Sequence, residues 1–570
     1  MQELSHFQNI ASHMIAADRE RDEMLRAMDA MWHNRWQLPP PLQAVGWVHK
    51  VVSTDPHDAV RAGTRVLSAV APRIRVQPLG EGAQTQRQAE RMERALAWHF
   101  RNASRRRRAN VLRDVVLSAL LYDEVVAQVI YLPAQQQAGQ LLGAAAGGPG
   151  AVASLRYGPF AIIVRNPQHV HVRYSDWQPE AVLLTQVMRV DEAVAFWGSA
   201  LAEKLPKPRR ARSGKRSEEL NYCTVFDYMD SEQRAVWALL QPDGAALAEP
   251  AGSEQAAAIE ILREAHGLGF LPWAAKVGGT TLHSGGLQRI PLLASIYQSK
   301  QWDTQNIVET LLASEVIAYA AAPRLKVEGP SAEVDVDYGE PGRVVHVPPG
   351  HQLSPLAAPG LDESLARIAE RVAERMGKST VPRVLQTADF PGGTAFATLN
   401  LATQSGIKSL TPYKELAQDA LAEVFHLMLS WVQHSGQPLN AYVNKRGKQE
   451  SIALDPAEAD LTQVLIDVEL TADVPTDRMA RINAASMAVR DLGYSRERAL
   501  EQIGETDAKE VMVQAEQEQL AAARLEARKR RLLAEAETVQ PSRRGFDPAA
   551  GGLPPVMADP EGVAGASTQA

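Results

Sequence analysis

The chain has 570 residues and a mass of 62.1 kDa, which is enough for several domains or for one elaborate subunit. Its 60 Lys and Arg against 67 Asp and Glu give a formal net charge of -7, which argues against a protein that coats nucleic acid by bulk charge attraction. One cysteine, Cys223, excludes an intramolecular disulfide framework and a cysteine-based zinc cluster, and no apolar run approaches the ~20 residues that span a bilayer.

The first part of the chain is predicted to be helical. Apolar residues recur at helical spacing in two stretches within 5–38, and Pro39–Pro41 ends this block because proline cannot continue a helix. A further helix is predicted over 55–70. A long helix over 85–121 follows, with an expected break at the arginine run 105–108.

The period of the apolar residues then changes to two, which is typical of strands. Strands are expected over 125–131, 160–165, 170–174, 222–227 and 232–240. A Pro-, Gln-, Gly- and Ala-rich segment at 133–152 is expected to form a loose excursion at a hairpin tip. A helix is expected near 191–196, and 204–216 is a basic, proline-containing loop.

The middle of the chain begins with a long helix followed by a small β-rich segment. Residues 291–322 contain no glycine, and no proline after the first residue, which predicts one helix of ~45 Å that ends at Pro323. Valines and leucines in 324–360 are separated by Gly-Pro, Gly-Glu-Pro-Gly and Pro-Pro-Gly, a pattern typical of short strands with tight turns.

An amphipathic helix is predicted next, over 361–376, because its apolar residues step by three or four. The apolar face consists of Leu365, Ile368, Val372 and Met376. A loop rich in proline and glycine follows at 378–393, and then helix over 394–433, interrupted at Gly406 and Pro412.

The C-terminal part alternates between strand-like and helical texture. Residues 440–475 are strand-like, and 476–537 are helical and highly charged. The last residues, 538–570, are rich in Gly, Pro and Ala, and we expect them to be disordered.

The segment Gly377-Lys378-Ser379-Thr380 matches the end of a phosphate-binding loop. The full motif needs a glycine five residues before Gly377, where Val372 stands, and a strand leading into it, where an amphipathic helix is predicted. Gly377 is better explained as a helix C-cap. A nucleotide-binding enzyme that uses Gly377–Thr380 is therefore the weaker hypothesis, and no pair of carboxylates is marked by its spacing as catalytic.

Two histidines, His169 and His171, would lie on one face of a strand and could form half of a metal site. No nearby cysteine or second histidine pair completes that site, so two outward-facing polar residues are the preferred interpretation and no metal is predicted. Cys223 on a predicted strand is interpreted as a small buried hydrophobic residue rather than a nucleophile.

Two dense basic clusters lie at 101–113 and 204–216. Either could contact phosphates, form a solvated surface or make salt bridges between subunits. The tryptophans show no alternation with basic residues of the kind that stacks nucleic-acid bases, which favours core and interface roles for them.

The order of the central segments resembles that of tailed-bacteriophage portal proteins, the head-to-tail connector family. The resemblance covers roughly residues 15–530 and rests on the succession 291–322, 324–360, 361–376, 378–393 and 394–433. Residues 52–76 and the segment Asn166-Pro167-Gln168-His169-Val170 are similar to the wing of that family.

The resemblance implies an α+β fold with a portal-type architecture: a mixed α/β wing, a helical stem, a small β-rich clip, a long helix after a tunnel loop, and a helical crown. The expected division is 1–290 for N-terminal helices and wing, 291–322 for the first stem helix, 323–360 for the clip, 361–377 for the second stem helix, 378–393 for the tunnel loop, 394–475 for the long helix and returning wing strands, 476–537 for the crown, and 538–570 for a disordered tail.

The resemblance also implies site residues. In the tunnel loop, the expected DNA-facing side chains are Arg383, Gln386, Asp389 and Phe390, with hinges at Pro382, Gly392 and Gly393. In the clip, the expected partner-docking residues are Lys326, Glu328, Glu333, Asp335, Asp337, Glu340 and Arg343. An ordinary helix connection remains the alternative for the loop, and simple solubility for the acidic clip.

The function implied is that of a portal vertex subunit, a non-enzymatic part of the virion that is assembled in the host bacterial cytoplasm. Its expected partners are other copies in a ring, usually a dodecamer, double-stranded DNA in the channel, the large terminase subunit, a head–tail adaptor, and the major capsid and scaffolding proteins. No cofactor and no membrane are expected. A different structural virion component, such as an adaptor or minor capsid protein, is the alternative. The net charge of -7 suits a conduit that does not grip DNA, with the basic clusters placed away from the pore.

Overall fold

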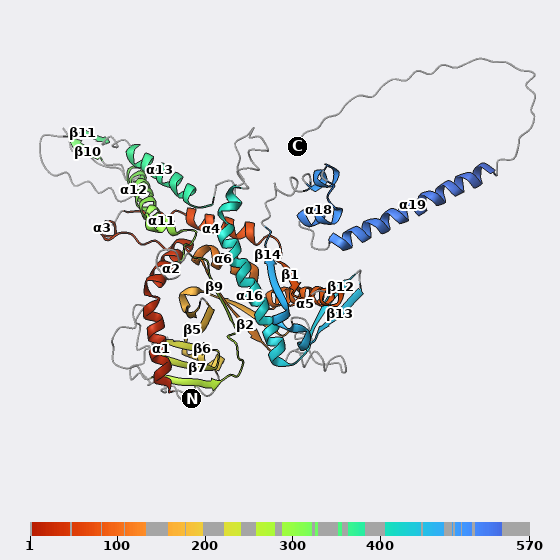
Figure 1. The fold of residues 1–570 in the computed structure, drawn as a ribbon. Helices are drawn as coiled ribbons and strands as arrows, with labels where there is room; N and C mark the ends of the chain where they lie inside the picture. The colour runs from red at the N-terminus through yellow and green to blue at the C-terminus, as the bar shows by residue number, and fades with distance from the viewer. Residues whose placement is uncertain are drawn as a thin grey trace, which may run out of the picture. The chain divides into compact units, whose positions relative to one another are not determined.

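The computed structural model of the chain describes residues 3–45, 48–80, 82–107, 109–132, 158–176, 178–197, 222–240, 258–279, 288–321, 325–328, 352–355, 363–381, 405–445, 448–471, 482, 485–491, 493–503 and 508–538. The chain divides into two compact units, Met1–Ala480 and Arg481–Ala570 (Figure 1). Helices and antiparallel strands are combined in the first unit, which confirms the predicted α+β class.

Six helices precede the first large sheet: α1 (Leu4–Ala17), α2 (Arg19–Trp32), α3 (Pro40–Gln43), α4 (Asp55–Leu67), α5 (Ala83–Arg107) and α6 (Val111–Tyr122). The predicted break in the arginine run is confirmed, and its cause is a helix cap. The side chain of Asn110 accepts a hydrogen bond from the backbone N–H of Arg113 at 3.3 Å, which satisfies one of the free amides at the start of α6.

Within the described ranges, the strands form two larger sheets and three two-stranded ribbons. The five-stranded sheet has the order β4 (Val170–Ser175), β5 (Gln178–Arg189), β6 (Tyr222–Asp230), β7 (Gln233–Leu240), β8 (Ile259–Ala265). The three-stranded sheet has the order β3 (Phe160–Arg165), β2 (Glu124–Tyr131), β9 (Trp273–Val277). The five predicted strands are thus confirmed as β2, β3, β4, β6 and β7, and β5, β8 and β9 are additions.

One ribbon joins the two ends of the first unit. Strand β1 (Arg73–Pro78) pairs with β14 (Val464–Glu469), with Ile74 opposite Val468. Its inward residues, such as Val76 and Ile466, are buried, so residues almost 400 positions apart share one core. A second ribbon pairs β12 (Leu439–Lys445) with β13 (Lys448–Leu454).

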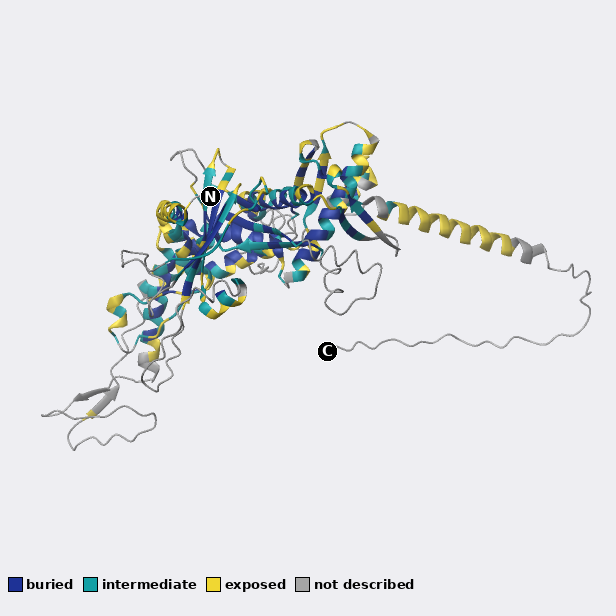
Figure 2. Ribbon diagram, turned by 90° about the horizontal axis from the view of Figure 1, so that it is seen from below, coloured by how far each residue is buried: buried dark blue, intermediate teal, exposed yellow. Residues whose placement is uncertain are grey.

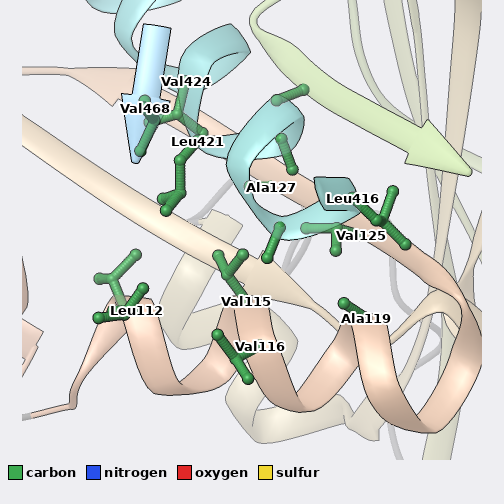
Figure 3. Close-up of a cluster of buried hydrophobic side chains, with 14 of the residues drawn as sticks. Leu112, Val115, Val116, Ala119, Val125, Ala127, Leu416, Leu421, Val424 and Val468 are labelled. Carbon is green, nitrogen blue, oxygen red and sulfur yellow. The ribbon is translucent and has the colours of Figure 1, made fainter. Parts of the chain in front are cut away.

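Helix α16 (Thr411–Ser435) lies at the centre of the main core. It packs against α6, β2, β9 and β14, and ten of its residues are buried (Figures 1 and 3). The side chains drawn there come from α6, β2, α16 and β14: Leu112, Val115, Val116, Ala119, Val125, Ala127, Leu416, Leu421, Val424 and Val468. Pro412 stands in the first turn of α16 and Gly436 ends it with φ +61°, so the predicted interruption at Pro412 is the helix start.

The predicted single helix over 291–322 is two helices, α11 (Ala294–Gln298) and α12 (Gln301–Ala321). The break is at Lys300, whose φ of +53° lies in the left-handed region and stops α-helical hydrogen bonding. The backbone of Lys300 still accepts the first bond of α12 from Thr304, so the turn redirects the chain without leaving the new helix uncapped. No glycine marks this position, which is why the sequence pattern missed it.

The second unit contains α18 (Arg496–Ile503) and α19 (Ala508–Thr538). Both fall in the region predicted to be helical and charged. Side chains 511–533 of α19 are exposed except for Met512, which is half-buried (Figure 2).

Candidate functional site

The most distinctive element of the first unit is a pair of helices joined through two short strands. Helix α13 (Glu363–Ser379) packs along α12, and the strands between them, β10 (Leu325–Glu328) and β11 (Gln352–Pro355), pair antiparallel (Figure 1). Because β10 follows α12 and β11 precedes α13, the strand pair lies at the same end of both helices. The result is a stalk with two helices and a β tip, referred to below as the helix–strand stalk.

A groove of about 520 Å³ runs between the two helices of the stalk. On α13 the groove is lined by three alanines at steps of three and four, Ala366, Ala369 and Ala373. Leu312 and Gln305 line it from α12. The alanines leave room for a close approach of the helices and also leave the groove open to solvent.

The apolar face of α13 is buried only at one end. Met376 is 1% exposed and Val381 is 0% exposed in the main core, and Val372 packs against that core. Ile368, two turns away, is 42% exposed. The predicted amphipathic face is therefore present, but within the described chain only the base of the stalk is covered.

Helix α12 behaves in the same way toward its outer end. Trp302 is buried in the main core, whereas Val316 and Ile317 are 49% and 42% exposed. Burying a side chain of this kind is worth about 1.5–3 kcal/mol. The outer part of the stalk thus presents apolar surface for which this chain supplies no cover in the described residues.

The base of the stalk is held by a row of polar side chains on α12 that sequence reasoning missed. The N–H groups of His49, Val51 and Ser53 donate to Ser314 Oγ at 2.7 Å, Thr310 Oγ1 at 3.1 Å and Asn306 Oδ1 at 2.7 Å, respectively. Trp302 Nε1 donates to the carbonyl oxygen of Ser53 at 3.2 Å. The extended segment 48–54 therefore runs along α12 and is held to it by these hydrogen bonds.

This polar row could have been read from the sequence. Trp302, Asn306, Thr310 and Ser314 are spaced by four, which places them on one face of a helix. Asn306 and Thr310 are fully buried, so their polar atoms need partners, and the extended backbone alternates its N–H groups to meet them. The signal is the spacing of Asn306, Thr310 and Ser314 by four residues, which places three hydrogen-bonding side chains on one face of the helix.

A second clamp joins the base of the stalk to the central sheet through buried charge. Glu124, at the start of β2, is fully buried, and its Oε2 lies 2.7 Å from Arg289 Nε and 3.2 Å from Arg21 Nε. The neighbouring Asp123 accepts a hydrogen bond from the N–H of Ile290 at 2.8 Å, and burial raises the pKa of Asp123 to about 6. Residues 289–290 precede α11 and α12, so these contacts fix the segment through which the chain enters the stalk.

The same cluster corrects the prediction for His169 and His171. His169 belongs to a 3-10 turn and is exposed, whereas His171 on β4 is buried, so the two rings do not share an outward face. His171 Nδ1 lies 2.9 Å from Asp18 Oδ2. Burial by itself raises the pKa of Asp18, but the His171 hydrogen bond and the charge of Arg21 hold it below its ordinary value.

The residues predicted to act in the tunnel loop lie outside the described residues, as do most of those predicted in the clip. Of the clip residues, Lys326 and Glu328 lie on β10, opposite Ser354 and Gln352 of β11. The segments 133–157, 204–216 and 539–570 also lie outside the described residues.

The segment Gly377–Thr380 lies at the C-terminal end of α13 and in the residue that follows it. The prediction of Gly377 as a C-cap is wrong, because α13 continues to Ser379. Lys378 Nζ is 2.6 Å from Glu374, and the Ser379 and Thr380 hydroxyls donate to carbonyl oxygens one turn back. A helix C-terminus presents carbonyl oxygens and negative potential, opposite to what a phosphate needs.

The remaining predicted features are located as follows. Cys223 is completely buried on β6, as predicted. In the first basic cluster Arg101 and Arg105 are exposed and Arg106 is half-buried. Among the described residues, no group of three or more His, Cys, Asp or Glu could hold a metal ion. Within the same part of the chain, no helix combines the length and the apolar character needed to cross a membrane.

No family model matches this chain. No curated protein matches its sequence. Among solved structures, a chain from the neck of an empty gene transfer agent particle, computed with C6 symmetry, aligns with TM-score 0.40 and 12% identity over 82% of this chain and 94% of that chain. A chain from the virion of the native particle gives 0.38 and 12% over 82% and 94%. A chain from the native neck, computed with C12 symmetry, gives 0.36 and 11% over 81% and 97%.

Proposed function

We propose that this chain is the portal subunit of a phage-like particle: a structural virion protein that forms a ring around a channel for double-stranded DNA. The observation that carries the proposal is the helix–strand stalk, which is fixed at its base and which the described residues leave uncovered along its outer length. Repeated around a ring by head-to-tail contacts, the stalks would form a channel wall.

The uncovered apolar residues support packing between neighbouring stalks. Val316 and Ile317 on α12 and Ile368 on α13 are exposed in the single chain. Groups of this kind on one subunit would be buried by the next, as in other oligomer interfaces, whose cores are more apolar than the rest of the surface. The open groove between the helices, lined by alanines, offers a place for a neighbour's side chains.

The two clamps at the base support a stalk that transmits force. The polar row on α12 and the ion pairs of Glu124 attach the stalk to two different parts of the first unit, the 48–54 segment and the central sheet. A subunit through which DNA is driven must keep its channel wall in place against load. Buried, paired charge and matched hydrogen bonds fix an orientation in a way that apolar packing alone does not.

The finer roles follow from the position of each segment relative to the stalk. The segment after α13 would be the tunnel loop, with Arg383, Gln386, Asp389 and Phe390 facing DNA and Pro382, Gly392 and Gly393 as hinges. The β tip and the residues between its strands would be the clip, where Lys326, Glu328, Glu333, Asp335, Asp337, Glu340 and Arg343 would meet the large terminase subunit and later the head–tail adaptor. Dodecameric symmetry, contacts with capsid and scaffolding proteins, and a place at the portal vertex belong to the same proposal.

A two-part experiment tests the proposal. Replacing 329–351 by a short Gly-Ser linker removes most of the clip while keeping β10 and β11. Rings with an unchanged number of subunits that no longer bind the large terminase subunit are expected. Loss of the rings would mean that this segment is an assembly element, and unchanged terminase binding would remove the docking role.

The tunnel loop is tested separately. Phe390→Ala is expected to leave ring assembly unchanged and to alter DNA packaging or retention in particles. Arg19→Ala, an exposed residue on α2, serves as the control, because the proposal gives it no part in the channel or in docking. Loss of assembly in Phe390→Ala would instead assign this residue to the folded core.

A further inference from the structure

Helix α19 contacts α18 of its own unit, but most of its length is exposed. Residues 513–533 are all exposed, including Leu520, Leu525, Leu532 and Leu533, each more than half exposed. Isolated helices are marginal in water unless packing covers an apolar face. Four exposed leucines on one helix therefore need a partner.

The apolar residues of α19 form two stripes rather than one. The first stripe contains Val511, Ala515, Ala522, Leu525 and Leu532, which follow one another at steps of four, seven, three and seven. The second contains Val513, Leu520 and Ala527 at steps of seven. Leu520 is nine residues from Val511, about two and a half turns, so the stripes lie on opposite sides of the helix.

Two opposite stripes do not suit a two-fold pair of helices, which needs a single seam. They suit a helix with one neighbour on each side, as in a closed ring, where the first stripe of each copy meets the second stripe of the next. The two faces differ in sequence, which is what a head-to-tail contact requires.

The charges in and beside the stripes are complementary at one stagger. Glu518 lies within the first stripe and Glu526 beside it, whereas Arg531 lies within the second stripe and Arg524 beside it. Shifting one helix along the other by five or six residues, about 8 Å, sets both glutamates against the arginines. The same shift sets Ala515 against Leu520. At zero shift, Glu518 would instead lie near Glu516.

We propose that α19 is a subunit–subunit interface in which its first stripe packs against the second stripe of α19 in the next copy, in parallel and staggered by five or six residues. This rests on the proposed ring and extends it: the ring would be closed by a belt of tilted helices, independent of the stalks. The occupant of each face is a second copy of this chain.

Disulfide trapping in the full-length chain tests the interface. In a Cys223→Ala background, three variants are prepared: Ala515→Cys, Leu520→Cys, and both together. The mass of each assembly is measured first, and the samples are then oxidised and run on a denaturing, non-reducing gel. The double variant is expected to give a ladder of covalent multiples, while each single variant stays monomeric, because like faces do not meet.

The outcomes separate the two proposals. Rings by mass without a ladder would overturn the α19 interface and leave the portal proposal in place. Dimers from a single-cysteine variant would overturn the head-to-tail arrangement in favour of a two-fold pair. Absence of both rings and ladder would overturn both proposals.

Discussion

Helices α16 and α19 are both long, and they differ in where their apolar residues go. Helix α16 buries ten residues against α6, β2, β9 and β14, whereas α19 leaves its leucines in solvent. The apolar side chains of α16 are buried within one chain, whereas those of α19 need another molecule to cover them. Apolar content alone does not distinguish these cases; the number of elements that surround the helix does. Substitutions should separate the two, with effects on folding in α16 and on assembly in α19.

The largest effect is expected at the centre of α16. Phe425 is fully buried, and its ring lies 5.4 Å from that of Phe100. Phe425→Ala should lower the free energy of unfolding of the first unit by about 3–5 kcal/mol, because it removes a large side chain and leaves a cavity. Leu525→Ala in α19 should change the unfolding of the dissociated chain by less than about 0.5 kcal/mol. Urea unfolding measures the free energy of unfolding of both variants. Comparable losses would contradict the distinction between a buried α16 and an exposed α19.

A similar loss is expected when a buried charge loses its partner. Glu124→Gln keeps the shape of the side chain but leaves Arg21 and Arg289 without their shared carboxylate, at a cost of about 3–5 kcal/mol. The control is Glu469→Gln. The Glu469 carboxylate lies 3.0 Å from the Arg75 guanidinium, and both side chains are about half exposed, so losing this pair should cost no more than about 1 kcal/mol. Equal losses in the free energy of unfolding would mean that the buried ion pairs of Glu124 stabilise the fold no more than an exposed pair does.

The burial of the Asp123 carboxyl should make the stability of the protein depend on pH. The pKa of Asp123 is raised from 3.8 to about 6, so its contribution to stability is full below pH 3.8 and lost as pH rises through 6. Asp123→Asn stays neutral, tolerates the positive φ and can still accept from Ile290. The variant should therefore gain stability relative to the wild type between pH 4 and pH 7.5, by at most about 3 kcal/mol. The same difference in thermal stability at both pH values would refute a raised pKa.

A smaller loss is expected from the polar row on α12. Thr310→Val preserves shape but leaves the N–H of Val51 without its acceptor, at a cost of about 1–3 kcal/mol. Thr304→Val is the matched control on the exposed side of the same helix, where the hydroxyl bonds only to the carbonyl oxygen of Lys300. Hydrogen exchange at Val51 should accelerate only in the first variant, and a response in both would indicate a general loosening of α12.

The sequence predicted those parts of the fold that depend on local periodicity. The break between α5 and α6, strands β2 to β4 and helix α13 all follow from apolar spacing and capping residues over a few turns. The break at Lys300 was not predictable, because neither glycine nor proline marks it. Strand β9 was missed because its short run around Trp273 becomes a strand only by pairing with β2.

The two polar clusters differ in the same way, in whether the local sequence carries a signal for them. The polar row on α12 had a readable signal, its spacing by four. The cluster around Glu124 had none, since Arg21, Asp18, His171 and Arg289 come from distant segments that only the fold brings together. Ile368 was correctly placed on an apolar face, but the sequence did not indicate that the face is uncovered in one chain, because exposure depends on neighbours.

The central claim is that the uncovered stalk belongs to a ring, and the mass of the purified full-length protein tests it most directly. Mass photometry at micromolar concentration, repeated from low to high salt, is expected to give one dominant assembly whose mass is an integral multiple of 62.1 kDa, with ring-shaped particles in negative stain. A single species at 62.1 kDa in every condition, with no rings on the grid, would contradict it.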